Sequence, residues 1–248
     1  EVINLAPMRE ARSDHRLAIV GNNLFAIGGY RPKDGALKTC EKLQLESTNQ
    51  SSWLPIASMN KKRKMFASVV VKNDTIIVFG GENDKKFHDS IEVYDISADT
   101  WTLIEAKLPG FITELEAVVI DNETVVLTGG KEQSAGQINM ATRFDVTNQS
   151  FDTDLPALKY PRSSHLVVFD GKYIYCFGGN QNEGKDHYEM LRYPPKGIDC
   201  QWECREYDFD TKPLNFLKTF TGTYAQKKED PGFLGFLGNF LCCGKRNQ

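Results

Sequence analysis

The chain has 248 residues, of which 40% are hydrophobic and 25% are charged, and its formal net charge is −3. This is the composition of an ordinary soluble globular protein, long enough for one large β domain or two smaller domains. The small net charge excludes a strong overall field for nucleic acids or membranes, and no apolar run reaches the roughly 18 residues of a spanning helix.

The first predicted element is a β-hairpin at residues 17–27, where the apolar runs LAIV and LFAI flank the turn GNN. The same pattern returns at residues 68–79, 117–127 and 166–177. Asn, Asp and Gly between β-branched runs are typical of tight hairpin turns. Because the runs are nearly continuous rather than alternating, we expect both faces of these strands to be covered.

Each predicted hairpin ends in a pair of glycines. The pairs follow one another at steps of 52, 49 and 49 residues, and they are Gly28-Gly29, Gly80-Gly81, Gly129-Gly130 and Gly178-Gly179. We expect these glycines to be structural, each pair ending an inner strand where neighbouring backbones and an aromatic layer crowd any side chain.

A polar loop and two weaker strands follow each glycine pair, and most of these strand pairs carry two large side chains. Tyr94 and Trp101 form the clearest pair, seven residues apart across a turn. The corresponding positions elsewhere are predicted to hold Leu43 or Leu45 with Trp53, Phe144 with Phe151, and Tyr193 with Trp202. A repeat of about 49 residues with four strands is typical of β-propeller blades, because stacking blades buries both apolar faces of each sheet.

With its double glycine, Tyr94 and Trp101, the repeat resembles the kelch family. The segments between blades, at residues 5–20, 56–71 and 155–169, resemble the linkers of that family. The third repeat departs from the pattern, because its linker lacks the usual Arg. The resemblance implies an all-β propeller of four-stranded antiparallel kelch blades over residues 1–205, followed by a non-repeat tail at 206–248.

We expect four full blades, with residues 1–8 as the last strand of a preceding repeat. The blades are placed at about 15–55, 66–105, 115–155 and 164–205. Kelch propellers usually have more blades than four, so we expect either a piece of a longer protein or a propeller that has lost blades.

Blade topology predicts one end of the blades as the binding face. The second-to-third-strand loops and the linkers between blades emerge at that end and carry the richer chemistry. The loops contribute Tyr30, Arg31, Glu82 and Asn180, and the linkers contribute Arg12, Ser13, Arg63, Lys64, Arg162 and Ser163. In kelch proteins that capture acidic peptides, Arg and Ser at this linker position contact the ligand, so the resemblance implies the same role here. Solvated loop charges are the alternative, and the basic run 61–64 could also pass for a nuclear-localisation signal.

The resemblance implies a protein-interaction module, similar to the kelch half of BTB–kelch adaptors that present substrates to cullin–RING ubiquitin ligases. The BTB domain would lie upstream, since the 248 residues hold none. An actin-binding cytoskeletal kelch protein is the alternative. A propeller enzyme of the copper-oxidase or sialic-acid-isomerase type is a third possibility, because His15 and His165 occupy equivalent positions. No catalytic motif supports it, so we expect no enzyme activity, cofactor, metal or nucleic-acid ligand.

The six cysteines are scattered, which favours reduced thiols in a cytoplasmic protein over a disulfide scaffold. Cys200 and Cys204 have no second pair at zinc spacing. In the tail, the apolar run 232–243 ends in Cys242 and Cys243 and precedes basic residues, so S-acylation could anchor the chain to a membrane. An incomplete fifth blade, a segment packed on an open edge of the propeller, or disorder are the alternatives for the tail.

Overall fold

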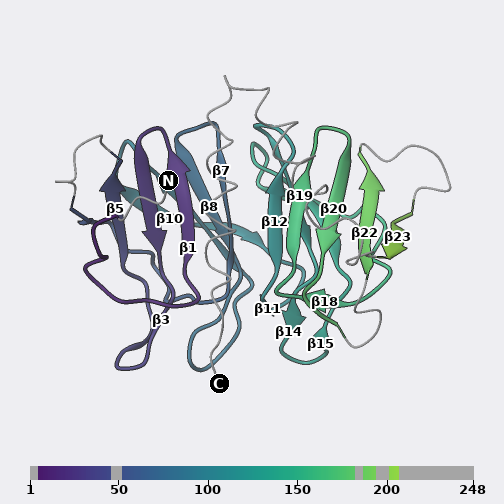
Figure 1. Cartoon of the computed structure of the whole chain (residues 1–248), viewed down its shortest axis with the longest axis horizontal. Coiled ribbons are helices and arrows are strands. Elements are labelled where there is room, and N and C mark those ends of the chain that lie inside the picture. Colours follow the sequence, from purple (N-terminus) through teal and green to yellow (C-terminus); the bar gives the residue numbers. More distant parts are fainter. Residues whose placement is uncertain (1–4, 46–51, 182–186, 194–200, 207–248) are drawn as a thin grey trace. The chain divides into compact units, whose positions relative to one another are not determined.

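The computed structural model of the chain describes residues 5–45, 52–181, 187–193 and 201–206 (Figure 1). Every regular element in these ranges is a β-strand, as the hairpin pattern predicts. By their contacts, the described residues form two compact units that divide between Thr113 and Glu114. Each unit contains two four-stranded antiparallel sheets, which are the predicted blades.

In the first unit, both blades are meanders in which each strand pairs with the next one in the sheet. Blade 1 consists of β1 (Arg16–Val20), β2 (Asn23–Ile27), β5 (Cys40–Gln44) and β6 (Leu54–Ile56). Blade 2 consists of β7 (Ala67–Val71), β8 (Thr75–Phe79), β9 (Ser90–Asp95) and β10 (Thr100–Lys107).

The second unit repeats this arrangement. Blade 3 consists of β12 (Glu116–Val119), β13 (Thr124–Thr128), β16 (Ala141–Asp145) and β17 (Ser150–Asp152). Blade 4 consists of β19 (Leu166–Phe169), β20 (Tyr173–Phe177), β22 (His187–Arg192) and β23 (Glu203–Glu206).

Short two-residue strands lie in the loops and linkers at the glycine end of the blades. They are β3 (Tyr30–Arg31), β4 (Gly35–Ala36), β11 (Ile112–Thr113), β14 (Lys131–Glu132), β15 (Gly136–Gln137), β18 (Arg162–Ser163) and β21 (Asn180–Gln181). The segment 5–8, expected as the end of a preceding strand, forms no strand, and residues 1–4 lie outside the described ranges.

Large side chains of the two outer strands meet across the blade. Tyr94 lies opposite Trp101 in the β9–β10 register, and their rings stack with centroids 4.9 Å apart. Phe144 and Phe151 are paired in the same way in blade 3 at 5.1 Å. In blade 4 the register corrects the predicted position of the partner: Leu191, not Tyr193, lies opposite Ile174 where Tyr94 lies opposite Ile76 in blade 2.

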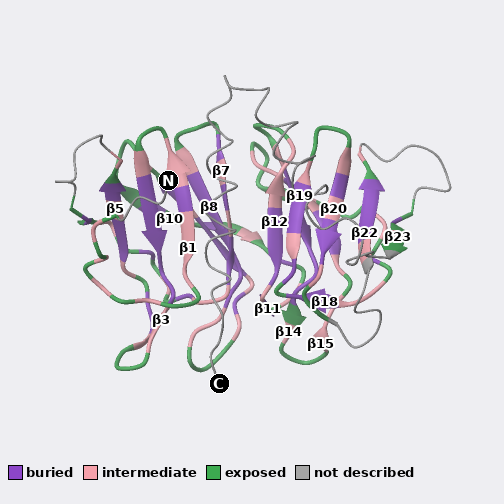
Figure 2. Cartoon of the chain, viewed as in Figure 1, coloured by how far each residue is buried: buried purple, intermediate pink, exposed green. Residues whose placement is uncertain are grey.

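The apolar core lies between the faces of neighbouring blades within each unit. One cluster joins the blade 1 face containing Phe25 and Ile27 to the blade 2 face containing Ile76 and Tyr94. A second cluster joins blade 3 to blade 4 around Trp202. Figure 2 shows the buried residues mainly along the strands and the exposed residues mainly in the turns and loops at their ends. Such double-sided burial explains why the strand sequences are continuous apolar runs.

Each tryptophan also ties its blade to the preceding linker. The indole Nε1 of Trp53, Trp101 and Trp202 donates to the backbone oxygen of Ala6, Ala57 and Pro156, respectively, at 2.8–3.0 Å. Phe151 has no such donor, so blade 3 lacks this tie.

Candidate functional site

The linker arginines expected to face a partner are buried inside the blades. Arg63 donates from Nε and Nη2 to Oε1 of Glu92, at 3.1 and 2.9 Å. Its remaining donors bind the oxygens of Gly80 and Ser90 at 2.7–2.9 Å. The side chains of Arg63 and Glu92 have no solvent exposure. Burial lowers the pKa of Arg63 from its usual value, and the adjacent Glu92 carboxylate opposes that shift.

The same buried pair recurs in two other repeats. Arg12 Nη2 donates to Glu41 at 2.9 Å, and Arg162 Nη2 donates to Glu189 at 2.6 Å. Each Nη1 donates to the backbone oxygen of the first glycine in its own repeat, at 2.7 and 3.0 Å. The three carboxylates also accept hydrogen bonds from linker N–H groups, those of Arg9, Asn60, Lys61, Lys159 and Tyr160.

This placement differs from the expectation that Arg12, Arg63 and Arg162 offer bidentate donors to a partner. Their guanidinium groups are used within the chain, because each fixes a linker onto its blade through a buried carboxylate. We therefore leave the three arginines out of the binding face.

The glutamate partners were missed in the sequence, although a signal for them existed. Glu41, Glu92 and Glu189 occupy one position of the third strand in their blades. In the third repeat, whose linker has Ile112 in place of Arg, that position holds Thr142. The arginine and the glutamate are therefore absent together, as expected of two residues that need each other.

The second glycines Gly29, Gly81 and Gly179 are crowded by linker backbone rather than by the Tyr94–Trp101 layer. Gly81 has a φ of +84°, and a Cβ there would lie 2.8 Å from the oxygen of Lys64 and 2.6 Å from Cβ of Phe66. The N–H of the second glycine donates to the next linker, as Gly29 does to Arg63 at 2.8 Å. A side chain at the second glycine would therefore push the linker away from the blade.

Short backbone ladders bring most of the other predicted site residues together in pairs. Ser13 and Tyr30 exchange two N–H···O bonds of 2.7 and 2.9 Å, and Lys64 and Glu82 exchange two of 2.9 and 3.0 Å. In blade 4, Ser163 of β18 pairs with Asn180 of β21. The linker and the loop thus present residues side by side at the same end of blades 1, 2 and 4.

Lys64 is the centre of a polar cluster in the first unit. Its Nζ lies 3.4 Å from Glu82, 3.9 Å from Asp84 and 4.6 Å from the centre of the Tyr30 ring. Asp84 in turn accepts the N–H of Ala36 at 2.9 Å, which joins the blade 2 loop to the blade 1 loop. These side chains are part-exposed or exposed and contact one another.

The remaining predicted residues differ in exposure. Arg31 forms an ion pair with Asp34 and is half-buried, while Asn180 is exposed. Ser163 is buried and donates to Glu114 at 2.9 Å.

In the described ranges, no group of three or more His, Cys, Asp or Glu could hold a metal ion, and no helix is long and apolar enough to cross a membrane. Cys40, Cys176 and Cys204 are free thiols, and burial raises the pKa of both Cys40 and Cys176 to about 12. Cys200, Cys242 and Cys243 lie outside the described residues, as does nearly all of the tail.

Comparison with known proteins agrees with this architecture. The model of the KLHDC2/KLHL20/DRC7 Kelch-repeats domain matches residues 14–207. The chain is 27% identical over 204 residues to Kelch-like protein 36 of Bos taurus, covering 79% of this chain and 32% of the relative. It is 30% identical over 111 residues to Kelch repeat and BTB domain-containing protein 1 of Ectromelia virus (strain Moscow), covering 45% and 19%.

Among solved structures, that of YjhT matches with a TM-score of 0.67 and 15% identity, over 83% of this chain and 68% of the other. At this identity the likeness concerns the fold alone. The chain spans about a third or less of the curated relatives just named.

Proposed function

The chain belongs to the kelch-repeat family, and on that premise we propose that it binds a partner protein through the glycine end of its blades, without catalysing a reaction. The observation that carries this proposal is the set of backbone ladders that hold linker and loop residues side by side. Such ordered loops on a rigid sheet scaffold are the usual location of binding residues.

In the first unit the proposed contact surface is the Lys64 cluster, defined as Tyr30, Arg31, Lys64, Glu82 and Asp84. Tyr30 offers a ring together with a hydroxyl group, a combination that is common in protein interfaces. Because internal ion pairs and hydrogen bonds already fix these side chains, a partner would lose little side-chain entropy in binding them. In blade 4 of the second unit, Asn180 is exposed at the position equivalent to Tyr30 and Glu82.

The finer proposal is that the partner is a substrate of a cullin–RING ubiquitin ligase, for which this chain acts as the recognition part of an adaptor. Its support is the similarity to Kelch-like protein 36 and to a relative whose name includes a BTB domain. We place the protein in the cytoplasm, where its free cysteines would stay reduced.

Affinity purification with mass spectrometry tests this function. Wild-type chain is compared with the Tyr30→Ala/Lys64→Glu variant, which removes the ring and reverses the central charge. Proteins lost from the variant are the expected partners, and ligase subunits or their substrates among them would support the adaptor role. Recovery of actin instead would favour the cytoskeletal alternative.

Lys72→Glu is the matched control, because Lys72 is exposed at the β7–β8 turn at the opposite end of the blade. Thermal melting of each variant checks that the blades stay folded. An unchanged set of partners in the folded double variant would rule out this face.

A further inference from the structure

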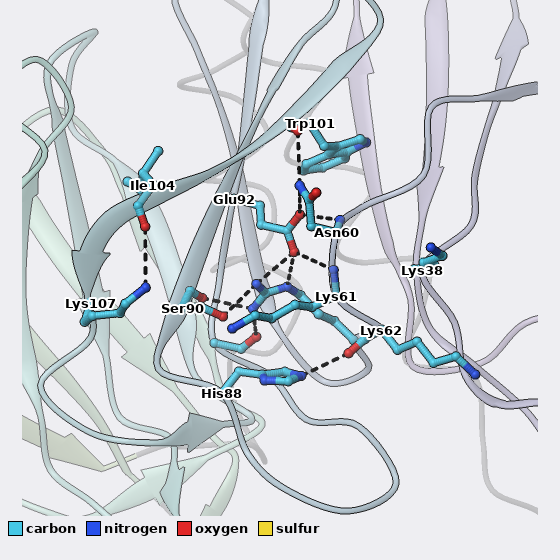
Figure 3. Close-up of polar contacts among 12 residues, drawn as sticks. Lys38, Asn60, Lys61, Lys62, His88, Ser90, Glu92, Trp101, Ile104 and Lys107 are labelled. Carbon is cyan, nitrogen blue, oxygen red and sulfur yellow. Dashed lines mark hydrogen bonds and ion pairs between the residues drawn. The ribbon is translucent and has the colours of Figure 1, made fainter.

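A group of lysines lies in and around the second linker, residues 57–66. Figure 3 shows lysines 38, 61, 62 and 107 around the Glu92 network, with Lys107 on the side of Ser90. Lys107 and Ser90 are opposite one another in the β9–β10 register. In the part of the chain that the structure describes, Lys61, Lys86 and Lys107 form no ion pair with a carboxylate.

The first linker, residues 5–15, shows what this position holds in an equivalent blade. Glu10 lies two residues before Arg12, and its carboxylate is 3.4 Å from Nη2 of that arginine. The same Oε2 atom accepts the hydroxyl of Thr39 at 2.6 Å. The first linker therefore places a carboxylate of its own beside the buried Arg12–Glu41 pair.

The second linker keeps every part of this arrangement except the carboxylate. Arg63 and Glu92 correspond to Arg12 and Glu41, and the hydroxyl of Ser90 corresponds to that of Thr39. Lys61 stands two residues before Arg63, at the position of Glu10. A cation therefore replaces an anion beside a guanidinium group.

The pKa of Lys61 reflects this replacement of an anion by a cation. The pKa of Lys61 is lowered, first by burial and then by the like charges of Arg63 and Lys107, with a smaller contribution from Lys86. Asp89 is the carboxylate that acts in the opposite direction. Lys61 is half-buried, and positive charges that lie close together are stabilised by an anion placed between them.

We propose that Lys61 and Lys107, the lysine site, bind an anionic side chain of a partner protein in the role that Glu10 plays within the first linker. The anion is the carboxylate of an acidic residue or the phosphoryl group of a phosphorylated one. Because Arg63 and Ser90 are fully buried, the ligand contacts the two ammonium groups and leaves the guanidinium group in place. This inference rests on the proposed interaction function and specifies the chemistry of one contact.

Fluorescence polarisation with two labelled peptides tests the lysine site. One probe is hexaglutamate, and the other is a Gly-Ser peptide containing one phosphoserine, so the stronger ligand identifies the anion. Hexaglutamine is the uncharged control. We expect one of the acidic probes to bind, with an affinity that falls as salt is raised to about 0.5 M because salt screens exposed charges.

Lys61→Glu supplies the missing carboxylate from the chain itself, so it should weaken probe binding by about tenfold or more. Lys107→Glu should weaken it similarly. Lys61→Glu should also raise the melting temperature, since its carboxylate would lie beside Arg63 as Glu10 lies beside Arg12. Lys72→Glu, which makes the same charge change at the opposite end of blade 2, should alter binding by less than about twofold.

The lysine site is refuted if neither acidic probe binds, or if Lys72→Glu weakens binding as much as Lys61→Glu. Either result leaves the broader function standing as long as partner recovery depends on Tyr30 and Lys64. If partner recovery did not depend on Tyr30 and Lys64 while the acidic probe still bound at Lys61, the proposed binding face would be contradicted. The lysine site would then still stand.

Discussion

At the scale of single residues, backbone conformation and close contacts explain why the second glycine of a pair recurs. The second glycine of a pair combines a left-handed backbone conformation with close contact to a linker backbone. Gly81 shows both features, whereas Gly171, in the β19–β20 turn, has a φ of +92° with nothing within 4 Å of a Cβ. A comparison of the two positions therefore distinguishes the cost of backbone strain from the cost of steric overlap.

Gly81→Ala is therefore expected to lower the free energy of unfolding by about 2 kcal/mol or more, because strain and overlap both contribute. Gly171→Ala should cost about 1 kcal/mol, since it introduces strain alone. Chemical denaturation of both variants measures the difference. Equal losses would show that the linker contact adds nothing.

His88 is a second residue whose position has a measurable consequence. Its ring is buried, and Nε2 lies 3.0 Å from the backbone oxygen of Lys62. Burial, followed by the charge of Arg63, lowers the pKa of His88 from 6.5 to about 4. Burial also lowers the pKa of His15 to about 4.

Folding therefore holds these histidines neutral between pH 6.5 and 4, where the unfolded chain takes up protons. Stability is fully present above pH 6.5 and is expected to fall as the pH drops from 6.5 towards 4. His88→Gln should make the melting temperature less dependent on pH over this interval, and His15 should contribute in the same direction. Melting curves at several pH values test this, and an unchanged slope would contradict it.

At the scale of the element, the linkers are fixed by a buried ion pair rather than by apolar packing alone. Removing one partner of such a pair leaves an uncompensated buried charge, whereas replacing both by uncharged residues is much less costly. In the third repeat the same two sequence positions hold the uncharged residues Ile112 and Thr142.

Glu92→Thr alone is expected to destabilise the fold by about 3–5 kcal/mol, because Arg63 is then buried without a carboxylate. The double variant Arg63→Ile/Glu92→Thr should recover a large part of that loss. A double-mutant cycle by urea denaturation measures the coupling between the two positions. Additive effects would mean that the pair does not act as a unit.

The linker also shows where sequence reasoning about the site succeeded and where it did not. Sequence placed Ser13, Lys64, Tyr30 and Glu82 at one end of the blades, and the structure brings them together in pairs. It also assigned Arg63 to the same surface, because the side chain of an arginine in a polar linker is normally solvated. The direction of that side chain depends on Glu92, 29 residues away on β9.

At the scale of the whole molecule, the described chain consists of two units of two blades each. The blades repeat one strand order and one glycine position, so each departure from the repeat is informative. The missing pair in blade 3 is such a departure, and it concerns stability. The position of Glu10 varies among the four linkers, and the lysine that it holds in the second linker is the basis of the proposed lysine site.

The sequence by itself determined the repeat, the strand order within a blade, the family and the end at which the loops gather. These features follow from local patterns, namely apolar runs, turn residues and glycine pairs at even spacing. Only the tertiary structure decided which charged residues are buried, that Leu191 rather than Tyr193 occupies the Tyr94 position, and that linker backbone crowds the glycines. Those outcomes depend on contacts between residues far apart in the chain, where burial and ion pairing outweigh the local preference of a polar side chain for water.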